Sequence, residues 1–259
     1  MLKKILKFSK REGLLKLIIK FLDYFLRPFG ILMSSFFFFK NRSFKKNFNF
    51  EKNYKYNFLR IYKYKIWKTD KNLSGTSSDL SVAKNYALKL RSFFISKKIK
   101  SILDCGCGEF RFMDIALKDL KLKYIGGDLV NDILIKNRVN FPRYKFIKFD
   151  ILRDRLPKVQ LLHIRDCLFH FSFKDIHKAL NNFCNSNIKF LLLTSHNSLI
   201  LKNYDIETGD FRYLDFSKKP FYFKNEILKI KDFVFPYFPK YSYLWSNFQI
   251  KKFLSNFYE

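Results

Sequence analysis

From Lys100 onward, short apolar runs alternate with segments in which apolar residues recur every three or four positions. The short runs have the length of strands, whereas the recurring segments have the period of helices packed on one face. The predicted strands span 101–103, 124–127, 145–149, 161–164 and 190–194, and a last strand is expected in the aromatic tail 237–245. The predicted helices span 110–120, 131–137 and 173–184. This alternation predicts an open, mainly parallel α/β sheet with helices on both faces.

Residues 1–27 have another pattern, which predicts a helix with one polar stripe along an otherwise apolar surface. Pro28 and Gly30 end this helix. The apolar run 31–39 comes next, but no window reaches about 20 residues without a charge, so a membrane span is not expected. Residues 1–39 fit either a helix docked on protein or a basic helix lying on an anionic membrane surface. Both interpretations stay open.

The segment between these regions, residues 41–72, is rich in Lys, Asn and aromatic residues without a clean period. It predicts a connection with short helical or irregular pieces. Ser74 to Asp79 form a turn-and-cap cluster, and helical spacing follows over 81–94. We therefore expect a helical, aromatic- and Lys-rich N-terminal extension, residues 1–70, and one domain, residues 71–259.

The formal net charge of +29 would suit a protein that binds nucleic acid. However, the chain has 39 Lys against 12 Arg, its basic residues occur in every segment, and it is also rich in Phe, Ile and Asn. All four enriched types have AT-rich codons, so a compositional bias explains the charge without a polyanionic partner. Nucleic acid is not the expected partner, although charge alone does not exclude it.

The four cysteines do not have the paired spacing of a zinc site. We expect small buried thiols in a reducing cytoplasm, and no metal. The N-terminus lacks the small-residue cleavage site of a signal peptide. The expected location is therefore the cytoplasm, with peripheral contact at the inner face of the membrane through residues 1–39 as the open alternative.

Three acids, Asp104, Asp128 and Asp150, stand at the ends of three successive predicted strands. Gly106 and Gly108 lie in the turn that follows the first strand, where a Cβ would keep a ligand away from the backbone. In an open parallel sheet, ligands bind beyond the carboxyl ends of the strands. Asp128 follows Gly108 by 20 residues, where a carboxylate can accept both hydroxyls of a ribose.

The same glycine turn argues against a dinucleotide. A pyrophosphate-binding turn has the pattern G-x-G-x-x-G, whereas the stretch from Gly106 to Arg111 has no third glycine. Asp104 precedes this turn and Glu109 lies within it, and both acids would repel a phosphate. A positively charged sulfonium with an amino-acid tail tolerates them.

At these residues the chain resembles the class I S-adenosylmethionine (SAM) methyltransferases. The stretch Ile102–Gly108 looks like the first motif of that superfamily, and Tyr124–Asp128 looks like the second. The resemblance implies a Rossmann-like class I methyltransferase sheet and SAM as cofactor. The cofactor-binding residues that it implies here are Asp104, Gly106, Gly108, Asp128, Leu129, Asp150, Ile151 and Asp166. Among them, the two glycines line the methionine part, Asp128 holds the ribose, and Asp150 with Ile151 flanks the adenine.

A closer resemblance, over roughly residues 60 to 250, is to bacterial methyltransferases often encoded with surface-polysaccharide genes. It rests on the stretches Ser74–Ser78, Arg165–His170 and Asn203–Ile206, together with Gly209 and Arg212. The resemblance implies a small-molecule or glycan-type acceptor. Asn203 and Arg212 would suit a hydroxylated or anionic acceptor, but a surface ion pair is an alternative for the arginine.

His170 is the candidate general base, because its unperturbed pKa of about 6.5 lets it take a hydroxyl proton as the methyl group arrives. The alternative is a histidine that binds the backbone and shapes its loop. Asp166, just past the fourth strand, is the second candidate catalytic residue, because the family borders both cofactor and acceptor there. His196 is a further candidate, whereas His163 and His177 look like ordinary strand and helix positions.

The predicted function is SAM-dependent methyl transfer, at oxygen, to a small-molecule or glycan-type acceptor. Two alternatives stay open. One is an RNA methyltransferase, which one continuous basic face would favour. The other is a non-catalytic protein that binds the cofactor or is recruited to a membrane partner through its N-terminal helix.

Overall fold

A computed structural model describes residues 50–69, 72–198, 201–232 and 238–255. The chain divides into two units, and the second comprises Phe50–Asp232 and Pro239–Glu259. The second unit carries the sheet. The predicted N-terminal helix and the apolar run that follows it lie outside the described residues.

Seven strands form one sheet in the order β3-β2-β1-β4-β5-β7-β6. Strands β1 to β5 pair in parallel, whereas β7 runs antiparallel to both β5 and β6. The bounds are β1 Ser101–Cys105, β2 Lys123–Asp128, β3 Lys145–Lys148, β4 Leu161–Ile164, β5 Phe190–His196, β6 Leu228–Lys231 and β7 Lys240–Ser246. The predicted open, mainly parallel sheet is confirmed.

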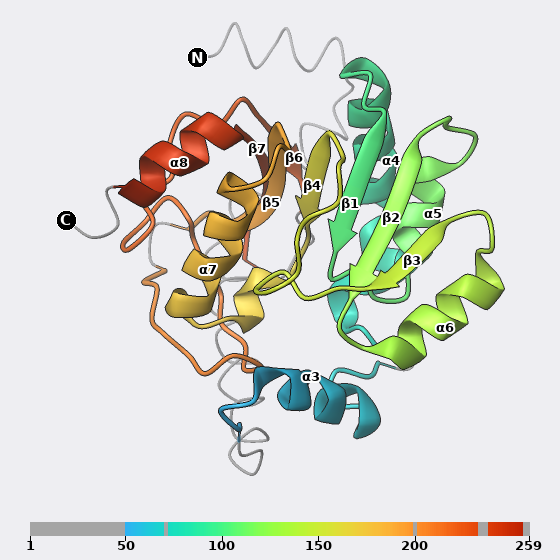
Figure 1. The fold of residues 1–259 in the computed structure, drawn as a ribbon, viewed down its shortest axis with the longest axis horizontal. Helices are drawn as coiled ribbons and strands as arrows, with labels where there is room; N and C mark the ends of the chain where they lie inside the picture. Colours follow the sequence, from blue (N-terminus) through green and yellow to red (C-terminus); the bar gives the residue numbers. More distant parts are fainter. Residues whose placement is uncertain (1–49, 70–71, 199–200, 233–237, 256–259) are drawn as a thin grey trace, which may run out of the picture. The chain divides into compact units, whose positions relative to one another are not determined.

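Helices cover both faces of this sheet, as predicted (Figure 1). Helices α4, α5 and α6 share one apolar cluster with the sheet, whereas α7 and α8 contact each other on the opposite face. The bounds are α3 Tyr54–Lys63, α4 Leu80–Ser96, α5 Arg111–Leu117, α6 Asn131–Asn140, α7 Phe173–Cys184 and α8 Asn247–Ser255, with 3₁₀ turns at Thr76–Ser78 and Leu168–His170. None of the helices within the described ranges is long and apolar enough to cross a lipid bilayer.

Local sequence explains where the best-predicted helices begin. The Ser172 hydroxyl accepts a hydrogen bond from the Asp175 amide at 3.2 Å, which caps α7, and Ile176 and Leu180 are fully buried one turn apart. The Asp79 carboxylate caps α4 in the same way, at 3.0 Å from the Ser81 amide. Helix α5 ends at Leu117, three residues earlier than predicted, because the chain turns there toward β2.

The carboxy-terminal part of the unit differs more from the prediction. The expected last strand is present as β7, but β6, its antiparallel partner, and the final helix α8 were not predicted. Residues 201–227 follow β5 as an irregular segment that has its own buried aromatic residues. Such a segment has no period, so hydrophobic patterning does not reveal it.

The core of this unit gives a direct stability test. Leu192 is fully buried on β5, between β4 and β7, so we expect Leu192→Ala to lower the free energy of unfolding by about 2–5 kcal/mol. Urea unfolding followed by circular dichroism measures this. Leu88→Ala on α4 is the matched control, because Leu88 is 47% exposed and its loss should change stability by less than about 0.5 kcal/mol. Equal losses in the two variants would contradict the assigned core.

Candidate active site

The glycine turn after β1 has room only for glycine. Gly106 and Gly108 have φ values of +76° and +50°, in the left-handed region that other residues rarely adopt. A Cβ on Gly108 would lie 2.9 Å from Ser74 Oγ, and one on Gly106 would lie 3.0 Å from Cys167 Sγ. The Gly106 amide donates to the Gly127 carbonyl at 2.8 Å, which ties the turn to the end of β2.

Asp128, the predicted ribose ligand, contacts this turn directly. Its carboxylate accepts hydrogen bonds from the Gly108 amide at 3.1 Å and from the Val130 amide at 3.0 Å, and the Leu129 amide also favours its charged form. Burial raises the pKa of Asp128, and the backbone amides partly offset that rise. Each carboxylate oxygen can accept a second hydrogen bond. The structure therefore brings Asp128 and the two glycines together at the carboxyl edge of the sheet.

Asp104 lies beneath the turn, with its side chain in the core. Its carboxylate binds His163 Nδ1 at 2.6 Å and accepts from the Tyr124 hydroxyl at 2.8 Å. His163 Nε2 lies 3.0 Å from the Tyr86 hydroxyl, which lies 2.8 Å from Ser242 Oγ. Asp104 therefore joins neighbouring strands instead of bonding the amides of the turn. His163, which looked like an ordinary strand position, is its partner, and no local pattern reveals that pairing.

Asp150, expected beside the adenine, is held by α3. Its carboxylate is buried, accepts from the Tyr54 hydroxyl at 2.7 Å, and pairs with Lys55 Nζ at 2.8 Å. Burial and the neighbouring Asp150 charge raise the pKa of Tyr54. Ile151 is buried next to it and its carbonyl accepts from Asn182 at 2.7 Å. Helix α3 crosses the carboxyl edge of the sheet (Figure 1), and it lies in the segment for which the sequence predicted short helical or irregular pieces.

The segment after α3 also reaches the glycine turn. The Tyr62 hydroxyl donates to Ser74 Oγ at 3.3 Å, and burial together with the Asp128 charge raises the pKa of Tyr62 well above its usual value. The Leu73 amide donates to Glu109 Oε2 at 2.7 Å. Glu109 therefore holds the loop over the turn. This loop contains the Ser-Gly-Thr-Ser-Ser stretch that the closer resemblance singled out.

Asp166 lies past β4 in a left-handed conformation, with φ of +54°. Its carboxylate accepts from Lys240 Nζ at 2.5 Å and lies 3.7 Å from Arg165 Nη1. Burial by itself would raise the pKa of Asp166, but Lys240 and Arg165 outweigh burial and hold the pKa well below its usual range. Asp166 is therefore ionised at neutral pH, where it is a weak base, and an orienting role suits it better than proton transfer.

Two further residues complete a buried group of four charges. Arg165 binds Asp232 in a bidentate pair, with Nε to Oδ2 at 2.8 Å and Nη2 to Oδ1 at 3.0 Å, and Lys240 Nζ lies 3.3 Å from Asp232. Arg165 also donates to the Ser77 carbonyl at 3.0 Å. Two cations and two carboxylates balance, so the group can be buried. Asp232 and Lys240 were not predicted, because they follow Arg165 and Asp166 by 67 and 74 residues.

His170, the candidate base, is half-buried in the 3₁₀ turn after β4. Its Nδ1 lies 2.8 Å from the Asp210 carbonyl, which can only accept, so Nδ1 carries a proton and Nε2 is the basic nitrogen of the neutral ring. The ring packs against Trp67 at an interplanar angle of 35°, with 4.3 Å between the ring centroids. This is the backbone contact expected of a histidine that shapes its loop, which was the alternative interpretation. The same contact orients the ring in the way that a general base requires.

His196, the further candidate, is buried against Phe169, with 4.5 Å between ring centroids. Burial, with a smaller effect of Lys240, lowers its pKa to about 3. It is therefore neutral and a poor proton acceptor at pH 7.

Asn203 and Arg212 support the irregular segment after β5. Asn203 binds both the amide and the carbonyl of Asp215. Arg212 is fully buried and donates to the Phe171 carbonyl.

The cysteines agree with the expectation of buried thiols, apart from one. Cys105, Cys107 and Cys184 are buried free thiols, whereas Cys167 is only half-buried beside Gly106. Burial raises the pKa of Cys184 to about 11, so this thiol is neutral at pH 7.

No protein-family model and no curated protein matches the chain. Among solved structures, magnesium protoporphyrin IX methyltransferase from Synechocystis PCC 6803, with bound SAM, matches with a TM-score of 0.54 and 11% identity, over 77% of this chain and 99% of that one. Human N-acetylserotonin methyltransferase in complex with SAM matches with a TM-score of 0.47 and 13% identity, over 66% of this chain and 52% of that one. Streptomyces venezuelae DesVI matches with a TM-score of 0.37 and 17% identity over 42% of this chain. This chain thus spans half (50%) of the DesVI length. The predicted Rossmann-like class I methyltransferase fold is confirmed.

The lowered pKa of His196 predicts a pH dependence of stability. Because the folded-state pKa is about 3 and the unfolded value is about 6.5, the unfolded chain takes up the proton first, and stability falls as pH drops below 6.5. Between pH 7 and pH 5 we expect wild type to lose about 2 kcal/mol more than His196→Gln. Urea unfolding at both pH values measures this difference, and parallel losses in the two proteins would contradict it.

Proposed function

We propose that this chain binds SAM at the glycine turn and Asp128 and transfers the methyl group to an oxygen of a small-molecule or glycan-type acceptor. The observation that carries the proposal is the contact between the Asp128 carboxylate and the Gly108 amide at the carboxyl ends of β1 and β2. In a sheet with this fold, ligands bind at that edge.

The residues at this edge fit SAM in three respects. Gly106 is exposed and has no Cβ, so a ligand can approach the backbone. Asp128 offers acceptor positions for a ribose diol beside backbone amides. The ionised Asp166 is compatible with positive charge, whereas a pyrophosphate would meet unfavourable acids. The bound cofactor supplies a methyl group on a positively charged sulfur.

The chain's own contribution is mainly alignment and exclusion of water, which are the effects that a methyl displacement needs most. Helix α3 and the loop after it lie over the carboxyl edge, held by Asp150 and Glu109. His170 takes the proton of the acceptor hydroxyl at Nε2, because its Nδ1 is fixed to the Asp210 carbonyl. Asp166 stays ionised and orients the ligands.

The acceptor class rests on two supports. The first is the resemblance of the loop and the irregular segment after β5 to methyltransferases encoded with surface-polysaccharide genes. The second is the position of that segment next to His170, since Asp210 and Gly209 both bond this residue. We therefore propose an acceptor made for surface polysaccharide, methylated in the cytoplasm, with residues 1–39 as the segment that would contact the membrane surface.

Binding of S-adenosylhomocysteine, the product form of the cofactor, tests the proposal without an acceptor. We expect Asp128→Asn to weaken binding at least about tenfold in isothermal titration calorimetry, because an amide loses the charge and one acceptor for the ribose diol. Asp114→Asn on α5 is the control, since this half-buried acid lies outside the glycine turn, and it should bind as wild type.

The outcomes separate the claims. Absence of binding to wild type would overturn the cofactor proposal, and equal affinity of Asp128→Asn would overturn the ribose assignment alone. For the acceptor class, tight binding of RNA that weakens steeply with salt would favour the RNA methyltransferase instead.

A further inference from the structure

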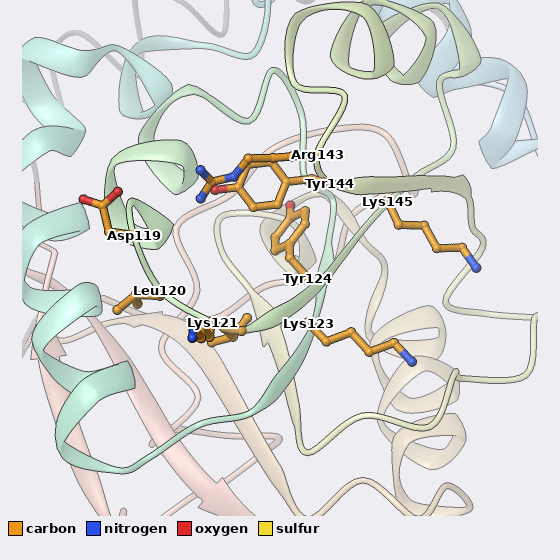
Figure 2. Close-up of a pocket in the computed structure, with 9 residues that line it drawn as sticks. Asp119, Leu120, Lys121, Lys123, Tyr124, Arg143, Tyr144 and Lys145 are labelled. Carbon is orange, nitrogen blue, oxygen red and sulfur yellow. The ribbon is translucent and has the colours of Figure 1, made fainter.

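A second concave site lies at the opposite edge of the sheet (Figure 2). This pocket, of about 640 Å³, is formed by the turn that leads into β2, residues 119–124, and the turn that leads into β3, residues 143–145. Lys123 begins β2 and Asp128 ends it, so the six-residue strand separates the pocket from the candidate active site by about 16 Å. Of the residues that line it, Tyr124 also reaches toward the candidate active site, where its hydroxyl donates to Asp104.

The rim of the pocket is strongly basic. Lys121, Lys123, Arg143 and Lys145 line it, against one carboxylate, Asp119. Within the described part of the chain, none of these four cations has a carboxylate oxygen within 4.0 Å. Lys123 and Lys145 start neighbouring parallel strands, and Figure 2 shows both side chains extending in the same direction, opposite to that of the Arg143 guanidinium. Like charges held together without counterions raise the free energy, and a bound anion would relieve this.

One donor in the pocket distinguishes it from an ordinary solvated lysine surface. The hydroxyl oxygen of Tyr144 is buried, and its O–H group has no acceptor among the described residues. The Arg143 guanidinium lies over the same ring, 4.6 Å from its centroid, and can only donate. Burial raises the pKa of Tyr144, so the hydroxyl keeps its proton. An anionic oxygen between Arg143 and Tyr144 would receive hydrogen bonds from both.

The pocket also has apolar walls. Leu120, Leu122 and the ring of Tyr124 line it, and the Tyr124 hydroxyl already donates to Asp104, so this residue offers only its ring. A free inorganic anion would use the cations but not these walls. The combination suits a ligand that has a multiply charged end and an uncharged, apolar or ring-shaped part.

We propose that this pocket binds a small phosphate ester of the diphosphate class, with the phosphates at Arg143 and Tyr144 and with the flexible side chains of the strand-end lysines turned toward them. The two or three negative charges of such a ligand match the net charge of the pocket rim, which has four cations and one carboxylate. The arginine adds a planar fork that fits phosphate oxygens. A soluble nucleoside diphosphate and a lipid-borne phosphate headgroup share this chemistry.

The test measures binding by the full chain at low salt. Calorimetry uses inorganic pyrophosphate and ADP as soluble probes, and vesicle sedimentation uses phosphatidylcholine with and without phosphatidic acid. We expect ADP to bind more tightly than pyrophosphate if the ligand is soluble, and binding to appear only with phosphatidic acid vesicles if the ligand is a lipid headgroup. Either result supports the site, and affinity should fall as salt rises.

Variants decide whether the pocket is responsible. Arg143→Gln and the double variant Lys123→Gln/Lys145→Gln should each weaken binding about tenfold, and Tyr144→Phe about fivefold. The matched control, Lys84→Gln/Lys174→Gln, removes the same charge from two exposed lysines on α4 and α7 and should leave the affinity unchanged.

Three results would overturn the proposal. They are no binding of any of these probes, equal loss in the control and pocket variants, and pocket-dependent binding of an RNA oligonucleotide without binding of pyrophosphate or ADP. S-adenosylhomocysteine binding is measured separately at the other edge of the sheet, so this proposal and the proposed function can fail independently.

Discussion

The buried carboxylate of Asp104 is the constraint on which the rest of the sheet depends. A charge in a core must be paired and hydrogen-bonded, and its partners here come from both neighbouring strands, Tyr124 on β2 and His163 on β4. The network continues through Tyr86 of α4 to Ser242 of β7. It therefore holds four strands and one helix in a single register directly below the glycine turn.

The candidate active site follows from that register. The turn starts two residues after Asp104 and bonds the end of β2, so the position of the strands decides how close Gly108 comes to Asp128. Past β4, the balanced group of Arg165, Asp166 and their partners from the β6–β7 side fixes the position of the chain in the same way. Alignment at this edge thus results from buried charge pairs below it.

The two edges of the sheet have opposite chemistry. The carboxyl edge gathers carboxylates and backbone amides under α3, whereas four cations line the pocket at the amino edge of β2 and β3, where Arg143 lies over the ring of Tyr144. Tyr124 takes part in both, because its ring lines the basic pocket and its hydroxyl bonds Asp104. The overall charge of the chain says little about either edge, since it is the placement of charges that differs between them.

Alternation of short apolar runs with helical periods was enough to predict five parallel strands, the main helices and the fold class, because backbone hydrogen bonding and one-sided burial leave a period in the sequence. The glycine pair and the acids at strand ends likewise indicated the edge of the sheet where a ligand would bind. The tertiary structure alone decided what each acid contacts. Asp150 meets Tyr54 across 96 residues, Asp166 meets Lys240 across 74, and Asp104 meets His163 across 59. Such pairs depend on strand order and on side-chain directions after packing, which local periodicity does not encode, so the roles of these residues became visible only when the chain was folded.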